Sequence, residues 1–164
     1  MGFRFAQGLV LLQAIACVVE VSLANKGWDS HTYPYNHSSA PKRFTVGGSQ
    51  HWQFGLNYTD WSLKTAPFYF NDTLVFKYDP PSNTTFPHGV SLLPNLRSFL
   101  NCDLKKAKLI ANQTQGGGNG FEFVLKKKNK KKPYYFVCGE RNGFHCKVGI
   151  MKFAVAPLLR PRPF

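Results

Sequence analysis

Four side chains that can bind metal ions lie close together in the last third of the sequence. The stretch CGERNGFHCKVGIMK, residues 138–152, contains Cys138, His145, Cys146 and Met151. Thiolate, imidazole and thioether groups together are the ligands of blue-copper sites. Two cysteines in an oxidising compartment can equally form a disulfide. The residue types and their spacing therefore indicate a metal site, a structural disulfide, or both.

The beginning of the chain decides how many cysteines are left for these roles. Residues 1–24 look like a cleavable export signal, because a positive charge precedes a short apolar run and the small residues of SLA. Its removal takes Cys17 away and leaves Cys102, Cys138 and Cys146. An odd number in an exported protein implies one disulfide and one remaining thiol. That thiol is held by a metal or a partner chain, or it is buried and unreactive.

Five N-x-S/T sequons support export and predict glycosylation on the protein surface. They begin at Asn36, Asn57, Asn71, Asn83 and Asn112. The final residues, AVAPLLRPRPF, are short and carry two arginines, so we see no signal for a GPI anchor. We expect a secreted, extracellular protein whose mature chain has no transmembrane segment. Association with the plasma membrane by another route stays open.

The chain carries a formal net charge of +13, and six lysines of it lie in KKKNKKK, residues 126–132. Basic blocks often bind nucleic acid, but export argues against that partner. We interpret the block as the solvated tip of a hairpin, with lysines that protect sheet edges. The alternative is attraction to an anionic polysaccharide or an acidic protein.

Short apolar stretches with strand-like patterns follow one another along the chain, separated by glycine, proline and asparagine. KRFTVGG, PFYFNDTLVFKYD, HGVSLLP, KAKLIAN and MKFAVAP each contain such a pattern. FEFVLK and PYYFVC flank the lysine block and look like the two strands of a hairpin. Only NYTDWSLKT and NLRSFLNCDLKKA are expected to hold short helical turns. The pattern predicts an all-β sandwich with Greek-key connections.

The same pattern predicts a single folded domain over residues 42–157. It follows a signal peptide at 1–24 and a polar N-terminal extension at 25–41. A short C-terminal tail at 158–164 completes the chain.

Several motifs, in order, resemble the phytocyanins, a family of plant blue-copper and copper-like proteins that includes plantacyanins, uclacyanins and stellacyanins. The motifs are FTVGGSQHWQFGLNYTDW, FYFNDTLVFKY, a histidine before a valine-containing strand, and YYFVCG followed by HC and MK. The resemblance covers about residues 42–157 and implies a cupredoxin-like β-sandwich.

The resemblance also implies roles for five residues. His88, Cys138 and His145 match the family's copper ligands, and Cys102 and Cys146 match its disulfide. One pair of cysteines would then stabilise the domain, and the third sulfur would bind the metal. A thiolate and two imidazoles suit both oxidation states of copper, which favours rapid electron transfer.

The sequence departs from the family pattern in the spacing of its ligands. Cys138 and His145 are separated by six residues, whereas phytocyanins commonly have four. The segment from His88 to Cys102 is about one residue longer than usual, which a bulge in the strand or the turn at Pro94 can absorb.

The axial copper ligand is a methionine or glutamine in the family. Counting residues forward from His145 and Cys146 places it at Ile150, whereas aligning the MK pair places it at Met151. Side chains alternate along extended chain, so a slip of one residue turns Met151 the opposite way unless a bulge at Gly149 restores it. Both alternatives stay open.

These features predict a secreted type-1 copper electron-transfer protein that uses one copper ion as Cu(II) and Cu(I). The alternative is a metal-free cupredoxin-like binding module of the cell wall or cell surface, like early nodulin-like relatives that lack the ligands. We expect no enzyme, since no paired carboxylates or activated nucleophile are evident. The expected location is the apoplast or cell wall. There we expect a monomer whose partner is a redox protein or an anionic cell-wall component, and not nucleic acid.

Overall fold

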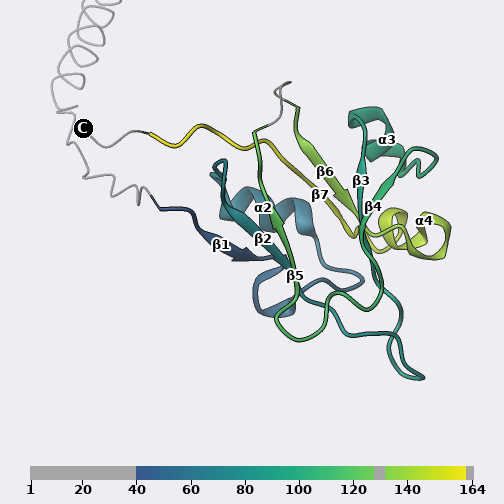
Figure 1. Ribbon diagram of the computed structural model, residues 1–164. Helices are drawn as coiled ribbons and strands as arrows, with labels where there is room; N and C mark the ends of the chain where they lie inside the picture. The colour runs from purple at the N-terminus through teal and green to yellow at the C-terminus, as the bar shows by residue number, and fades with distance from the viewer. Residues whose placement is uncertain (1–39, 128–131, 162–164) are drawn as a thin grey trace, which may run out of the picture. The chain divides into compact units, whose positions relative to one another are not determined.

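The computed structural model describes residues 40–127 and 132–161. Two β-sheets face each other across an aromatic core (Figure 1), with strand orders β1–β2–β5 and β4–β3–β6–β7. The strands are β1 (Arg43–Thr45), β2 (Thr73–Phe76), β3 (Val90–Leu93), β4 (Lys108–Ala111), β5 (Phe121–Val124), β6 (Tyr134–Val137) and β7 (Lys152–Val155). The arrangement confirms the predicted β-sandwich.

Large rings from both sheets fill the space between them. Phe76 of β2, Phe136 of β6 and Phe153 of β7 are fully buried. The ring centroids of Phe76 and Phe136 lie 5.4 Å apart, and those of Phe136 and Phe153 lie 5.0 Å apart. Trp52, from the segment between β1 and β2, contacts Phe76 and Phe153 at centroid distances of 5.3 and 6.0 Å. Burying these rings and packing them against one another, with Trp52 edge to face, contributes much of the core's stability.

The prediction of a hairpin around the lysine block is wrong, because β5 and β6 belong to different sheets. β5 pairs with β2, whereas β6 pairs with β3 and β7. Phe123 of β5 meets Tyr134 and Phe136 of β6 edge-on across the core, at 5.3 and 5.2 Å between ring centroids. Facing sheets pack the partly buried Phe123 against the two buried rings of β6, which a shared hydrogen-bonded ladder would not do.

Of the three α-helices in the described residues, two lie where the sequence predicted helical turns. These are α2 (Tyr58–Thr65), which packs against β7, and α3 (Leu96–Asn101). Asn57 caps α2 and Asn95 caps α3, each accepting a backbone N–H bond from three residues on. A short 3₁₀ turn, η2 (Gly48–Gln50), precedes Trp52.

Two local predictions are wrong. Helix α4 (Glu140–Lys147) lies where no helix was expected. The expected strand Phe68–Phe70 is reduced to an isolated bridge between Tyr69 and Leu158. The register between β3 and β4 shifts between Val90 and Ser91, which agrees with a bulge in β3, one of the two alternatives for the added residue.

The surface agrees with the sequon pattern wherever it is described. Asn57, Asn71, Asn83 and Asn112 are all exposed. Asn36, the predicted signal peptide and most of the predicted extension lie outside the described residues. In the predicted tail, Leu158 bonds to the Phe68 carbonyl, and the side chain of Arg160 pairs with buried Asp72. Within residues 40–127 and 132–161, no helix has the length and apolar character needed to span a membrane.

Candidate metal centre

Three potential ligands that are distant in the sequence meet at one end of the four-stranded sheet. His88 precedes β3, Cys138 follows β6, and His145 lies in α4. Ser91 of β3 pairs with Val137 of β6, so the antiparallel register brings the start of one strand beside the end of the other. The Cys138 sulfur lies 3.4 Å from His145 Nδ1 and 3.9 Å from His88 Nδ1. The three ligand atoms lie within 4.8 Å of one another.

This group is suited to binding one copper ion. Nitrogen and sulfur ligands lie about 2.0–2.3 Å from a bound transition metal, so two ligands of one ion are about 3–4 Å apart. The two sulfur–nitrogen distances fall in that range. Two imidazoles and a thiolate are also the softer donors that copper prefers. His51, in contrast, is exposed and is not part of the group.

Burial keeps the three side chains neutral at pH 7. Burial, with the adjacent His145 acting in the same direction, lowers the pKa of His88 to about 4. Burial also lowers the pKa of His145, and it raises the pKa of the Cys138 thiol to about 11. Both imidazoles therefore have a free lone pair for a metal, while the thiol must lose its proton when a metal binds.

The backbone around Cys138 partly offsets this cost. The N–H groups of Gly89 and Glu140 bond to the Cys138 sulfur and act against the rise in its pKa. The Gly89 carbonyl in turn accepts a bond from the Trp52 indole at 3.1 Å. A fully buried core residue thus holds the segment that carries His88 and that bonds to the thiol.

The six residues between Cys138 and His145 are accommodated by a kink in α4. Arg141, Asn142 and Gly143 all have left-handed backbones, with φ angles of 51°, 53° and 82°. Such a run is unfavourable for residues other than glycine, and it interrupts the helix with a kink. His145 then returns to within hydrogen-bonding distance of Cys138 despite the longer loop. No apolar period marks this turn, so the sequence did not predict it.

The structure distinguishes Met151 from Ile150 by burial. Met151 is fully buried in the core cluster that contains Cys138, whereas Ile150 is 39% exposed. Ile150 has a left-handed backbone, with φ of 47°, which is a strained conformation for a β-branched residue. The backbone of Met151 joins the two ligands beside it: its carbonyl accepts from Cys138 N–H at 2.9 Å, and its N–H bonds to the His145 carbonyl at 3.0 Å.

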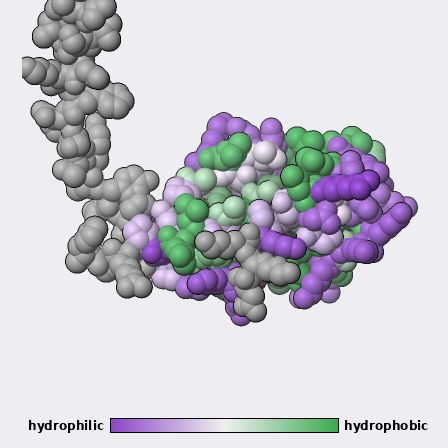
Figure 2. Space-filling model, turned by 90° about the horizontal axis from the view of Figure 1, so that it is seen from above, coloured by the Kyte–Doolittle hydropathy of each residue, from purple (hydrophilic) through white to green (hydrophobic). Residues whose placement is uncertain are grey.

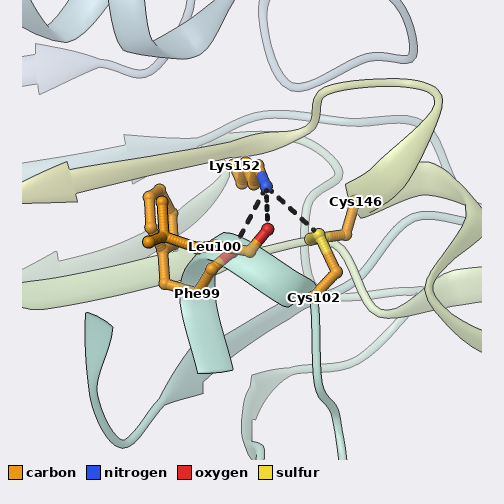
Figure 3. Close-up of a disulfide and its surroundings, with 5 residues drawn as sticks. All are labelled: Phe99, Leu100, Cys102, Cys146 and Lys152. Atoms are coloured by element: carbon orange, nitrogen blue, oxygen red, sulfur yellow. Dashed lines mark hydrogen bonds between the residues drawn. A yellow bond between two sulfur atoms is a disulfide. The ribbon is translucent and has the colours of Figure 1, made fainter. Parts of the chain in front are cut away.

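A disulfide joins Cys102 to Cys146, the residue after His145, as the family resemblance implied. Cys138 is the free cysteine of the described residues, and it is buried. Figure 3 shows Lys152 reaching from β7 to this disulfide. Its ammonium bonds to the Phe99 and Leu100 carbonyls at 3.2 and 3.1 Å and approaches the Cys102 sulfur at 3.4 Å. A cation at the C-terminal end of α3 complements the helix dipole, so Lys152 links α3, the disulfide and β7.

Aromatic side chains cover His145. The Phe54 ring lies edge-on to it at 5.3 Å and stacks on Phe144 at 5.7 Å, measured between centroids. Gly149 permits this approach, since a methyl group there would overlap the Phe54 ring and the His145 carbonyl. Sequence reasoning missed Phe54, Trp52 and Lys152. Each acts through contacts with segments more than 35 residues away, for which local patterns carry no signal.

Comparisons with known proteins agree with this geometry. No protein-family model matches the chain. Early nodulin-like protein 16 of Arabidopsis thaliana is 31% identical over 113 residues, which are 69% of this chain and 58% of that protein. The chain thus spans little more than half of the relative's length. Cucumber stellacyanin, solved with Cu²⁺, is 20% identical with a TM-score of 0.54, and the match covers 74% of this chain and 98% of that one. These findings support the phytocyanin family.

The match to stellacyanin identifies the fold of this chain as a cupredoxin-like sandwich. Spinach plantacyanin also matches, at 24% identity, a TM-score of 0.44, and coverage of 66% of this chain and 94% of that one. Within this sandwich, the described residues contain a His–Cys–His group suited to one copper ion.

Proposed function

We propose that the protein is a secreted type-1 copper electron carrier. The observation that carries this proposal is the convergence of His88, Cys138 and His145, with ligand atoms within 4.8 Å of one another. A metal-free binding module would not require these three residue types to converge from three separate segments. A bound copper ion would supply the redox chemistry by passing between Cu(II) and Cu(I).

The protein's own residues would keep the ligand positions fixed during electron transfer. Cys138 and His145 are almost fully buried, and the disulfide at Cys146 restrains the backbone next to His145. Rigid ligands limit rearrangement between the two oxidation states. His88 is the most accessible of the three and borders a pocket of about 360 Å³, so we infer that a redox partner approaches from its side.

Copper binding can be tested by titrating the purified protein with Cu(II) and recording its visible absorption. A thiolate–Cu(II) bond gives an intense band, which we expect from the native protein and not from Cys138→Ser. His88→Ala should weaken binding strongly, whereas His51→Ala, a matched change at an exposed histidine outside the group, should not. A colourless native protein with one titratable thiol would contradict the proposal and favour the metal-free binding module.

We further propose Met151 as the axial ligand, in preference to Ile150. Its complete burial beside Cys138 and the exposure of Ile150 support this choice. Because the axial ligand tunes the potential, Met151→Gln should shift the reduction potential of the copper-loaded protein. The measurement is protein-film or spectroelectrochemical titration, with Ile150→Val as the control. An unchanged potential in Met151→Gln would remove Met151 from the site.

The exposed sequons and the predicted signal peptide support secretion as a glycoprotein. We propose an extracellular location, in the apoplast or cell wall, and glycosylation at Asn57, Asn71, Asn83 and Asn112. The partners we propose are a redox protein at the copper end and an anionic cell-wall component elsewhere on the surface.

A further inference from the structure

A groove of about 410 Å³ lies on the four-stranded sheet, and we call it the lysine groove. Lys106, Lys108 and Lys132 line it. All three are exposed, and no Asp or Glu of the described chain lines the groove with them. Three like charges without a lining carboxylate give the groove a positive potential.

The lysine groove lies at the end of the sheet away from the metal centre. Lys108 pairs with Leu92, and Leu93 pairs with Tyr135, all of which line the groove. His88 lies five residues before Leu93, which corresponds to roughly 16 Å of extended chain. Figure 2 views the domain from above Figure 1, where β3 ends and β6 begins, and patches of hydrophilic and hydrophobic residues are interspersed on this face. A ligand in the groove would therefore leave the metal end accessible.

The surface between the lysines is largely apolar. Leucine, proline and tyrosine residues form it, among them Leu92, Pro94 and Tyr135. A ligand that complements this surface must combine an apolar face with regularly spaced negative charges. A chain of uronic acids has both, because each sugar ring carries a C–H face and one carboxylate.

We propose that the lysine groove binds an acidic polysaccharide composed of uronate residues. The choice of lysine fits this ligand, because an ammonium is a compact charge on a flexible stem that can meet single carboxylates in varied positions. No arginine of the described chain lines the groove, so the bidentate forks typical of phosphate recognition are absent from that lining. A membrane surface is less suitable, because insertion requires apolar groups that protrude, whereas these lie in a recess.

Glycans on the described sequons would not occupy the groove. Asn57, Asn71, Asn83 and Asn112 are exposed elsewhere and none lines it. The binding also does not require copper, since no metal-ligand candidate lines the groove.

The test compares two variants of the full chain that lose the same charge. Lys106→Gln/Lys108→Gln changes the groove, and Lys42→Gln/Lys64→Gln changes two exposed lysines outside it. We expect the first to bind immobilised polygalacturonate about tenfold more weakly than the native protein, and the second to differ by less than about twofold. Binding of the native protein should weaken with added salt and be lost on methyl-esterified polygalacturonate.

Equal loss in both double variants would overturn the proposal, because net charge alone would then explain binding. Tighter binding to polyaspartate, or to vesicles containing phosphatidylserine, would assign the groove to an acidic protein or a membrane instead. Thermal unfolding checks that both variants remain folded. Copper absorption is recorded in a separate experiment and tests the electron-carrier proposal alone. If that proposal fails, the result for polysaccharide binding is unaffected.

Discussion

Replacing Trp52 with alanine is expected to lower the free energy of unfolding by about 3–5 kcal/mol. The indole is fully buried and packs against Tyr58, Phe76 and Phe153, with centroid distances of 4.4, 5.3 and 6.0 Å. Its removal leaves a large cavity between the sheets and an unpaired Gly89 carbonyl. Denaturant unfolding of the metal-free protein measures the effect without a contribution from bound copper.

The variant Trp52→Phe separates the contribution of ring packing from that of the hydrogen bond to Gly89. It keeps most of the ring packing and removes only the bond to Gly89, so a smaller loss of about 1–3 kcal/mol is expected. Because Gly89 N–H bonds to the Cys138 sulfur, this variant should also alter the absorption of the copper-loaded protein. If Trp52→Phe and Trp52→Ala lost equal stability, ring packing would not be the main contribution of Trp52.

Replacing Cys102 and Cys146 together with serine should lower the free energy of unfolding by about 2–4 kcal/mol. The bond closes a loop with a sequence separation of 44 residues, and loss of the crosslink gives the unfolded chain more freedom. It should also weaken copper binding, because His145 adjoins Cys146 and loses a fixed neighbour. Unfolding curves and Cu(II) titration of the same preparations test both effects.

Cys138→Ser is the matched control, since it removes a buried sulfur but keeps the disulfide. In the absence of metal it should change stability less than the double substitution does. A double variant that unfolds like the native protein would show that β7 and the bonds of Lys152 restrain α3 without the disulfide.

Much of the sandwich could be predicted from local patterns, because alternating burial marks a strand wherever one face meets the core. In the stretch MKFAVAP, Phe153 and Val155 are buried while Ala154 between them is exposed. The assignment of β5 and β6 to opposite sheets could not be predicted, since it depends on how Phe123 meets Phe136 across the core. Period-two patterns identify strands but not their partners.

The candidate site was also predictable only in part. The resemblance to phytocyanins identified His88, Cys138 and His145, and it predicted the disulfide between Cys102 and Cys146 that the structure contains. The surroundings of these residues were not predictable. The Trp52 bond to Gly89 and the Lys152 bonds to α3 connect segments that only the completed fold brings together.

The left-handed run at Arg141, Asn142 and Gly143 has a consequence for recognising such proteins. It takes up the added length between Cys138 and His145 and still leaves sulfur and nitrogen 3.4 Å apart. A short sulfur–nitrogen distance is therefore compatible with a loop of six residues between the two ligands. Sequence patterns that require a fixed interval would overlook a centre of this kind, whereas a search for two imidazole nitrogens around one sulfur would find it.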